Sequence, residues 1–471
     1  MKMYLAGQWV ERSEKIEVRN PYDNSVVDTV PRADLADVDL ALQTALRGAD
    51  IMRKMETYER SELLNKAARL VEERSEDLAK TITMEEGKII GEARVEASRA
   101  VQTLLVSAEE AKRLSGEMVP LGGAPGSGNR LGFTLRVPCG VVVAVTPFNF
   151  PLNLVAHKVG PALAGGNSVV IKPASDTPLS ALKLTEILLE AGFPAPAVQC
   201  VTGSGGEVGH ALCSDRRVRK ITFTGSRDVG ENICKTAGLK KVTMELGSNA
   251  PLIVMPDADL EKVCQAILAT GYSNAGQVCI SAQRIIALRE IYRDLGEALR
   301  PQVTALDVGD PLLEGTKMGP MIREEDAQRV EYWVQEAVSG GAKVLAGGER
   351  LGTIHSPTLV ADVNPDMRIS REELFGPAVA LSACDSVNEA IKLANDTNYG
   401  LSAGIFTQNL DWAMQFAREV DSGNLHVNWG PQWRADLMPY GGLKDSGFGK
   451  EGPKYAIQEM TEEKMVVLHL E

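Results

Sequence analysis

Cys279 is the residue whose surroundings most favour chemistry. It lies in the segment GYSNAGQVCISAQR (271–284), where small and polar residues predict a loop. Residues 260–270 predict a helix before this loop, and residues 284–288 predict a strand after it. A loop held between rigid elements is a common place for a reactive side chain. A free cysteine is more often a small buried hydrophobe, so the segment alone leaves both interpretations open.

Polar residues also stand at the ends of four short apolar runs. They comprise TPFNFP (146–151), KPAS (172–175), TGS followed by Gly230 (224–230), and ELG (245–247). A lone glutamate such as Glu245 is more often a helix cap or a salt-bridge partner, and a lone glycine turn is more often structural. A shared position at strand ends favours a functional interpretation, because open α/β sheets bind ligands at the carboxyl ends of their strands.

The elements that carry these residues form a regular pattern. Helical segments such as LSALKLTEILLEAG (179–192) alternate with apolar runs, which are residues 141–145, 168–172, 198–203, 220–225, 242–247 and 251–255. Strands that are apolar throughout and separated by helices predict a parallel sheet covered on both faces. We therefore predict an α/β protein built on a doubly wound, nucleotide-binding sheet.

The rest of the chain predicts a second α/β region and a small β element. The second region spans roughly 256–440, with helices near 259–270, 323–338 and 386–395. The Gly- and Pro-rich break at 120–130 predicts the tip of a protruding hairpin. The tail MVVLHLE (465–471) is apolar but too short to bury itself, so we expect it to add to a sheet of its own chain or of a partner.

Composition excludes several classes of function. The formal net charge of -13 and the absence of a Lys/Arg cluster argue against a nucleic-acid groove. The seven cysteines include no C-x-x-C pair and no short spacing to histidine, so we expect neither a metal site nor a redox dithiol. No segment reaches the ~18 continuous apolar residues of a membrane span, and charged residues interrupt the N-terminal stretch where a signal peptide would be apolar. We expect a cytoplasmic protein without a membrane or nucleic-acid partner.

Taken in order, the motifs resemble those of the aldehyde dehydrogenase superfamily over essentially the whole chain. To the four strand-end motifs the sequence adds GQVC (276–279), EELFGP (372–377) and PYGG-x-K (439–444). The resemblance implies a dinucleotide-binding domain (1–117 and 139–250), a catalytic domain (251–445) and a small bridging element (118–138 and 446–471). Such a bridge implies a homodimer or a homotetramer.

The resemblance also implies a catalytic set of Cys279, Glu245 and Asn149. The Cys279 thiolate would attack an aldehyde carbonyl, hydride would leave to the nicotinamide, and a thioester would remain. The amide of Asn149 and the backbone N–H of Cys279 would form the oxyanion hole, where one donor is worth about 2.7–4 kcal/mol. Glu245 would activate the water that hydrolyses the thioester, a role worth roughly 10²–10⁴-fold. Because coenzyme-A-acylating members generally lack this glutamate, we expect a free acid as the product.

A dinucleotide site follows from the same resemblance. The residues implied are Thr146, Pro147, Phe148, Lys172, Ser175, Gly205, Gly209, Thr224, Gly225, Ser226, Gly230, Glu245, Leu246, Glu373 and Phe375. Residues 225–230 open a helix whose N–H groups suit a pyrophosphate, and Glu373 and Phe375 resemble the pair that holds the nicotinamide ribose and ring.

The sequence departs from NAD-preferring relatives at Ser175. Those relatives often carry glutamate three residues after the lysine, where a carboxylate repels a 2′-phosphate. With Ser175 there and Lys172 nearby, we predict that NADP is used beside or in preference to NAD. The neighbouring Asp176 would reverse this preference if its side chain turned inward.

The substrate tunnel would be lined, by alignment with the family, by Phe150, Asn153, Leu154, His157, Val278, Ile280 and the segment 429–438. His157 stands where several relatives have tryptophan, which predicts a more polar pocket. Arg434 would meet an anionic or hydroxylated substrate, or would be a solvated loop arginine. We predict NAD(P)-dependent oxidation of a small polar, lactaldehyde-like aldehyde. The alternative is a semialdehyde or a phosphate, phosphonate or sulfo-aldehyde substrate with strict NADP dependence.

Two other classes of protein fit less well. A cysteine hydrolase would need a base, and none of the five histidines (157, 210, 355, 426 and 469) is placed by a motif. A non-catalytic scaffold would have no need to keep Cys279, Glu245, Asn149 and Lys172 together.

Overall fold

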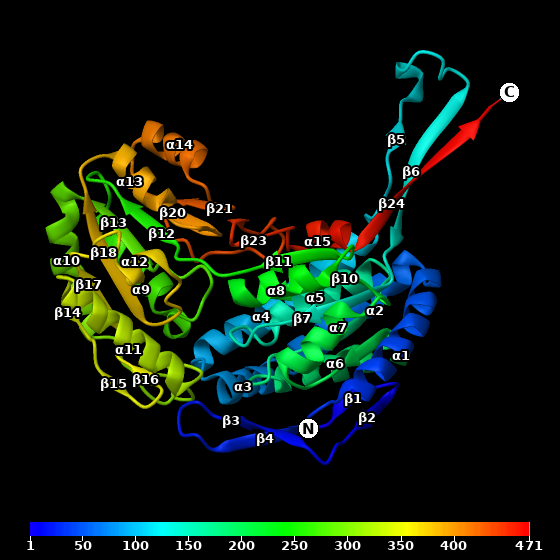
Figure 1. Cartoon of the computed structure of the whole chain (residues 1–471), viewed down its shortest axis with the longest axis horizontal. Helices are drawn as coiled ribbons and strands as arrows, with labels where there is room; N and C mark the ends of the chain where they lie inside the picture. Colours follow the sequence, from blue (N-terminus) through cyan, green and yellow to red (C-terminus); the bar gives the residue numbers. More distant parts are fainter. Residues whose placement is uncertain (471) are drawn as a thin grey trace.

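The computed structural model describes residues 1–470, which form two large sheets with their helices and a projecting three-stranded arm (Figure 1). The first sheet has the order β2–β1–β9–β8–β7–β10–β11–β23. Its strands are β1 (Met3–Leu5), β2 (Gln8–Val10), β7 (Val141–Val145), β8 (Ser168–Lys172), β9 (Val198–Cys200), β10 (Val218–Thr224), β11 (Lys241–Glu245) and β23 (Gly447–Phe448). The five central strands are parallel, and β1, β2 and β23 add antiparallel edges.

Helices cover both faces of this sheet because its strands are apolar on both sides. Val142 and Ala144 of β7 pack with one helical layer, whereas Val141, Val143 and Val145 pack with the other. The first layer contains α2 (Thr57–Glu73), α3 (Ser75–Glu86), α4 (Ile90–Ala111), α5 (Asn153–Ala164) and α6 (Leu179–Ala191); the second contains α1 (Leu35–Lys54), α7 (His210–Ser214) and α8 (Arg227–Ala237). The prediction of a doubly wound α/β sheet is confirmed.

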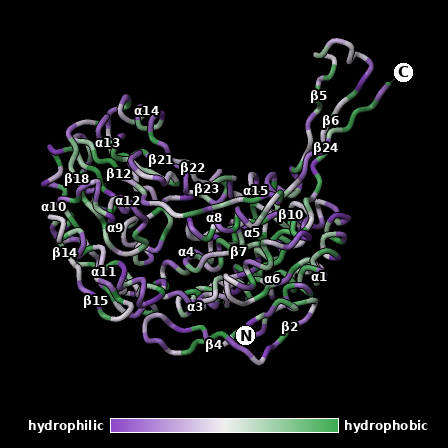
Figure 2. Tube along the Cα trace, in the orientation of Figure 1, coloured by the Kyte–Doolittle hydropathy of each residue, from purple (hydrophilic) through white to green (hydrophobic). Residues whose placement is uncertain are grey.

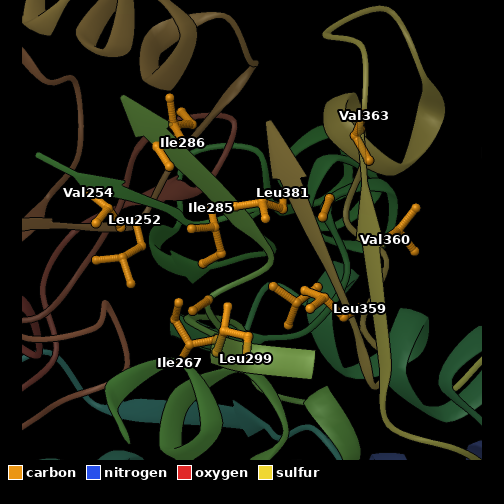
Figure 3. Close-up of a cluster of buried hydrophobic side chains, with 14 of the residues drawn as sticks. Leu252, Val254, Ile267, Ile285, Ile286, Leu299, Leu359, Val360, Val363 and Leu381 are labelled. Atoms are coloured by element: carbon orange, nitrogen blue, oxygen red, sulfur yellow. The ribbon is translucent and has the colours of Figure 1, made fainter. Parts of the chain in front are cut away.

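The second sheet has the order β14–β17–β18–β13–β12–β20–β21, and only β14 is antiparallel to its neighbour among the described residues. Its strands are β12 (Pro251–Val254), β13 (Arg284–Leu288), β14 (Lys343–Ala346), β17 (Thr358–Ala361), β18 (Ala378–Cys384), β20 (Ser402–Phe406) and β21 (Asn424–Val427). Figure 3 shows the apolar core where β12, β13, β17 and β18 meet Ile267 and Leu299. Those two side chains come from α9 (Leu260–Gly271) and α10 (Arg289–Thr304).

Three further helices belong to this second region: α11 (Glu324–Ser339), α13 (Val387–Asn395) and α14 (Leu410–Glu419). The helices predicted near 259–270, 323–338 and 386–395 are confirmed as α9, α11 and α13. The smaller elements are β3 (Lys15–Arg19), β4 (Val26–Pro31), β15 (Arg350–Leu351), β16 (Ile354–His355), α12 (Arg368–Arg371), β19 (Tyr399–Gly400) and β22 (Leu443–Lys444). No helix among the described residues is both long enough and apolar enough to cross a membrane.

The arm consists of β5 (Met118–Val119), β6 (Arg130–Pro138) and β24 (Thr461–His469). Strand β24 pairs antiparallel with β6 from Thr461↔Pro138 to His469↔Arg130, so the tail adds to a sheet of its own chain. The arm projects from the body, with residues 120–129 at its tip (Figure 1). Figure 2 shows β24 passing from hydrophilic residues near the body to hydrophobic residues toward the C-terminus.

The structure corrects the predicted start of the second bridging segment, 446–471. Gly447 and Phe448 form β23, which pairs with β11 of the first sheet. This close approach depends on glycine, because a Cβ on Gly447 would lie 1.9 Å from the carbonyl oxygen of Met244. Helix α15 (Pro453–Glu459) then packs on α5 and α4, so within this segment only β24 belongs to the arm. Residue 471 lies outside the described residues, and the rest of the domain division stays a prediction.

Candidate active site

A cavity of about 460 Å³ brings together residues of the first sheet and its helices with residues from loops of the second region. Six residues predicted for catalysis or substrate binding line it with Cys279, and they are Glu245, Phe150, Asn153, Val278, Ile280 and Arg434. Leu154 of the predicted tunnel also lines it. Residues that are far apart in the chain therefore share one enclosed space.

Cys279 lies in the loop between α9 and β13, as predicted, and is half-buried. Just before it, Asn274 and Ala275 both adopt left-handed backbone conformations, with φ of 51° and 52°. The Sγ atom of Cys279 lies 3.3 Å from the hydroxyl of Tyr440. Burial raises the pKa of the Cys279 thiol to about 12, so the group is protonated in this state.

Glu245 is the last residue of β11, and its side chain is buried beside Gly441. A Cβ added to Gly441 would lie 2.9 Å from Oε1 of Glu245. Neither carboxylate oxygen has a hydrogen-bond partner among residues 1–470. Burial, and next the charge of Glu451, raise the pKa of Glu245 well above its ordinary value. A buried carboxyl with a raised pKa and no fixed partner is suited to exchanging a proton with a bound molecule.

Asn149 connects two loops of the site. Its side-chain amide donates to the carbonyl of Gln277 at 2.8 Å, two residues before Cys279. Its own carbonyl accepts from Lys88 Nζ at 2.5 Å and from Asn274 at 3.4 Å. Asn149 does not line the cavity in this state, and its oxyanion role stays a prediction.

Arg434 is buried against the cavity, so the alternative of a solvated loop arginine is wrong. Nη1 donates to Glu451 at 3.1 Å, Nη2 donates to Nδ1 of His157 at 3.1 Å, and the guanidinium lies 4.1 Å from the ring centre of Tyr440. Its Nε–H is buried without a partner among the described residues. An unsatisfied charged donor at a cavity wall is costly unless a ligand accepts from it.

His157 does not line the cavity, so the prediction that it forms part of the tunnel wall is wrong for this structure. The side chain is fully buried in α5, behind Arg434. Its Nε2 lies 2.8 Å from Asp436 and 3.4 Å from Thr103. Both ring nitrogens find partners in the protein interior, which explains why the imidazole does not turn toward the open space.

Sequence reasoning missed several charged or polar residues of this cavity. Arg99, Tyr440, Glu451 and Lys88 line it, and Lys158 supports Glu451 through a 2.7 Å ion pair. Glu92, Glu96 and Arg99 lie on one side of α4 at spacings of four and three residues, the helical signal that would have identified them. Glu451 and Lys158 carry no comparable signal, because 293 positions separate them in the chain.

The predicted cofactor residues gather at the carboxyl edge of the first sheet. Thr146, Pro147 and Phe148 follow β7, and Lys172 and Ser175 end or follow β8. Gly205 and Gly209 bound a short helical turn after β9, and a Cβ on either would meet no atom within 4 Å. Thr224 to Gly230 lead from β10 into α8, and Glu245 and Leu246 follow at β11. The parallel strands thus bring all these residues to one edge, as predicted.

Local geometry at this edge suits a dinucleotide. A second cavity of about 450 Å³ lies beside α8, lined by Arg227, Gly230, Leu246 and Phe448 among others. Gly230 packs tightly against Leu246, because a Cβ there would lie 2.4 Å from the Leu246 side chain. The open backbone after β9 and the space beside α8 fit a bound nucleotide.

Lys172 and Ser175 lie where the 2′-position was predicted to bind. Burial lowers the pKa of Lys172 to about 8, and its Nζ donates to the carbonyl of Pro173 at 2.9 Å. The hydroxyl of Ser175 donates to the carbonyl of Gly203 at 3.1 Å. Asp176 pairs with Arg323, which supplies its carboxylate with a partner of opposite charge. Asp176 still lies near enough to Lys172 for its charge to oppose the lowering of the Lys172 pKa by burial.

Glu373 and Phe375 stand close to the strand-end residues of the first sheet. Glu373 accepts from the backbone N–H of Ser248 at 2.9 Å, and burial raises its pKa to about 7. Phe375 has a left-handed backbone, with φ of 51°, and its ring meets that of Phe148 edge to face at 5.8 Å. The two residues therefore join the second region to the cofactor edge.

Comparison with known proteins decides the family. The aldehyde dehydrogenase family model matches residues 9–466. The chain belongs to the aldehyde dehydrogenase family. The predicted family, the α/β fold and the prediction of an enzyme are thereby confirmed.

Three relatives show how this aldehyde dehydrogenase compares with others. The chain is 50% identical to a 3-sulfolactaldehyde dehydrogenase of Priestia megaterium, over 99% of this chain and 98% of that one. It is 38% identical to a lactaldehyde dehydrogenase of Methanococcus vannielii, over 99% and 100% of the two chains. A solved glyceraldehyde-3-phosphate dehydrogenase of Methanocaldococcus jannaschii, complexed with NADP, matches with a TM-score of 0.94 and 37% identity, over 98% and 100% of the two chains. The coarse prediction of a dehydrogenase acting on small aldehydes is confirmed.

Proposed function

We propose that this aldehyde dehydrogenase oxidises a small aldehyde with an anionic head, of the sulfolactaldehyde type, to its carboxylic acid. The observation that carries the proposal is the guanidinium of Arg434, which lines the cavity of Cys279. A sulfonate, carboxylate or phosphate in this cavity would pair with its positive charge.

A second arginine supports an anionic substrate. Arg99 lines the same cavity, and its side chain remains 28% exposed although it pairs with Asp436 at 2.9 Å. Two guanidinium groups at one wall suit an oxyanion with several acceptor oxygens. The 50% identical relative is named for a sulfonated aldehyde, which agrees with this charge.

The proposed reaction uses Cys279, Glu245 and Asn149. Once deprotonated, the Cys279 thiolate adds to the aldehyde carbon, and the amide of Asn149 stabilises the oxyanion. Glu373 and Phe375 would hold a nicotinamide, which when bound would supply the hydride acceptor. Glu245 then takes a proton from water, which attacks the thioester, releases the acid and restores Cys279. Glu245 suits this step because its carboxyl has no fixed partner among residues 1–470.

We infer that NADP is the better of the two cofactors, with NAD also accepted. Position 175 carries a hydroxyl in place of a carboxylate, and the nearby carboxylate of Asp176 is paired with Arg323. A 2′-phosphate would therefore meet the Lys172 ammonium without a fixed negative charge at position 175.

We also infer a homodimer or homotetramer in the cytoplasm. The outer edge of β24 is unpaired among the described residues, and Leu131, Leu135, Met465 and Leu468 are exposed on the arm. An apolar strand edge of this kind is suited to pairing with a second copy. All seven cysteines are free, which fits a reducing compartment.

The test is a steady-state assay of NADPH and NADH formation with six aldehydes. The panel contains 3-sulfolactaldehyde, lactaldehyde, glyceraldehyde, succinate semialdehyde, phosphonoacetaldehyde and benzaldehyde. We expect the highest kcat/KM with sulfolactaldehyde. Arg434→Met should lower that value about 10- to 150-fold, since a hydrogen bond to a charged group is worth about 1.5–3 kcal/mol. Arg217→Met, at a surface ion pair far along the chain, is the matched control.

The neutral substrate lactaldehyde is the competing candidate, because the 38% identical relative is named for it. A higher kcat/KM with lactaldehyde than with each anionic aldehyde would overturn the proposal. So would an Arg434→Met variant that keeps its full preference for sulfolactaldehyde.

A further inference from the structure

His157 lies between two groups that can each make only one kind of hydrogen bond. The ionised carboxylate of Asp436 only accepts, and it lies 2.8 Å from Nε2. The guanidinium of Arg434 only donates, and its Nη2 lies 3.1 Å from Nδ1. The neutral imidazole with its proton on Nε2 is therefore the one form that satisfies both neighbours.

The same carboxylate also holds Arg99. Asp436 accepts from Nη2 of Arg99 at 2.9 Å and from Nε at 3.3 Å, and it accepts from the amide of Asn153 at 3.3 Å. The chain of contacts Arg99–Asp436–His157–Arg434 thus connects the two arginines of the cavity wall through groups that are themselves buried.

We propose that His157 is a positioning residue that sets the preference of the enzyme for anionic aldehydes. Its Nδ1 accepts a hydrogen bond from Arg434 and so orients the guanidinium. Its Nε2 donates a hydrogen bond to Asp436, which in turn holds Arg99. Both cations are then oriented before substrate binds, so that binding an anion does not have to order them. The inference rests on the proposed function, because it assigns a role to residues behind the proposed anion site.

The role of His157 is orientation and not charge. Burial, and next the positive charge of Arg434, lower the pKa of His157 to about 4, so the ring is neutral at physiological pH. The charged groups around it are Arg434, Asp436 and Glu451. A protonated ring would point an N–H at the guanidinium and would lose the contact that orients it.

Three substitutions separate the two hydrogen bonds. In His157→Asn the side-chain oxygen replaces Nδ1 as the acceptor for Arg434. In His157→Gln the side-chain nitrogen replaces Nε2 as the donor to Asp436, but the acceptor for Arg434 is lost. In His157→Leu both bonds are lost. The matched control is His355→Asn, at a buried histidine of the β15–β16 hairpin that does not line the cavity.

The measurement is the ratio of kcat/KM for 3-sulfolactaldehyde to kcat/KM for lactaldehyde, with NADP saturating. We expect His157→Leu and His157→Gln to lower this ratio at least about tenfold, which corresponds to about 1.4 kcal/mol. We expect His157→Asn to keep it within about threefold of the wild-type ratio, and His355→Asn to leave it unchanged. Lost packing alone lowers activity on both aldehydes and does not change their ratio.

A double substitution tests whether His157 acts through Arg434. In an Arg434→Met background, His157→Gln should change the ratio less than about twofold, because the contact it breaks is already gone. The Asn and Gln variants keep a polar side chain of similar size, so the test remains available if His157→Leu does not fold.

The outcomes distinguish this inference from the proposed function. A wild-type ratio below one overturns the proposed function. The role of His157 alone is overturned by a different result. In that case the wild-type ratio is above one and Arg434→Met lowers it, but His157→Leu and His157→Gln leave it unchanged. Equal losses in the Asn and Gln variants would also contradict it.

Discussion

The groups proposed to react and the groups proposed to recognise the substrate share one cavity but are held very differently. Among the described residues, the thiol of Cys279 has one hydrogen-bond partner, the hydroxyl of Tyr440 at 3.3 Å, and the carboxylate of Glu245 has none. Arg434 and the residues behind it are bonded to one another by several hydrogen bonds of 2.7–3.1 Å.

The difference follows from what each group must do. A nucleophile and a base change their bonds and protonation during a reaction, so strong fixed partners would have to be broken at each turnover. A recognition group keeps its charge and gains from being oriented in advance. The buried, unpartnered Glu245 lowers the stability of the fold by about 1–3 kcal/mol, a cost that suits a catalytic group better than a structural one.

Among the variants of the two proposed reactive residues, Cys279 and Glu245, Cys279→Ala should have the largest effect. We expect kcat to fall at least about 10⁴-fold, since no other group can form the covalent intermediate. NADPH formation measures the loss, and binding of NADP to the variant, followed by fluorescence, should persist. Cys264→Ala, at another buried free cysteine, is the control and should keep most of its activity. Full aldehyde oxidation by Cys279→Ala would refute the mechanism.

Glu245→Gln should separate the two halves of the reaction. Hydrolysis of the thioester should slow by roughly 10²–10⁴-fold, because the general base is lost. A rapid burst of NADPH, close to one per active site, should survive in stopped-flow absorbance. In the wild type, the hydrolysis rate should rise with pH as Glu245 deprotonates, and the raised pKa of Glu245 places this rise above the ordinary range of a carboxyl. An unchanged pH profile in Glu245→Gln would assign the base to another residue.

Glu451→Gln removes the carboxylate that forms ion pairs with Lys158 and Arg434. Glu451 pairs with Lys158 at 2.7 Å and with Arg434 at 3.1 Å, and its loss leaves two buried cations unpaired. We expect the free energy of unfolding to fall by about 3–5 kcal/mol in urea denaturation. Glu190→Gln, which removes an exposed pair with Arg74, should cost less than about 1 kcal/mol. A similar small loss for Glu451→Gln would show that the buried network does not stabilise the fold.

From the lowered pKa of Glu451 we also predict that the free energy of unfolding depends on pH. Burial alone would raise the pKa of Glu451, but Lys158, Arg434 and His157 outweigh it and lower the pKa to about 2. A depressed carboxyl pKa stabilises the fold above the unfolded value of about 4.3. This contribution should be lost as the pH falls from there toward about 2. Glu451→Gln should lack it, which acid titration of both proteins by circular dichroism would show.

Ser175 belongs neither to the proposed reactive residues nor to the buried residues around Arg434. We therefore expect Ser175→Glu to have the smallest effect on the reaction. A carboxylate at position 175 would repel a 2′-phosphate, so kcat/KM for NADP should fall about tenfold while that for NAD is retained. Ser175→Ala is the control and should keep the wild-type preference. Equal losses with both cofactors would show that position 175 does not discriminate between them.

Sequence motifs were sufficient to name the candidate catalytic residues because each motif is local. Cys279 in its loop, the strand ends at Glu245 and Lys172, and the alternation of β-rich and helical runs each depend on a few neighbouring residues. The spacing of apolar residues also predicted helices α9, α11 and α13 of the second region, because their apolar periodicity is strong.

The residues behind the cavity could not be predicted in the same way. His157 was expected to face the substrate, yet its partners Asp436 and Arg434 lie 279 and 277 positions away. Glu451 lies 17 positions from Arg434 and 293 from Lys158. A side chain turns toward whichever partner the fold brings near, and no local pattern encodes that choice.

By itself, the sequence determined the α/β class and pointed to a candidate nucleophile and a candidate dinucleotide edge, because short-range periodicity and strand-end motifs carry these signals. The tertiary structure decided which charges meet: it buried Arg434, turned His157 away from the cavity and left Glu245 without a partner among residues 1–470. These outcomes depend on contacts between distant segments, because the tertiary structure sets both the burial and the neighbouring charges that shift each pKa.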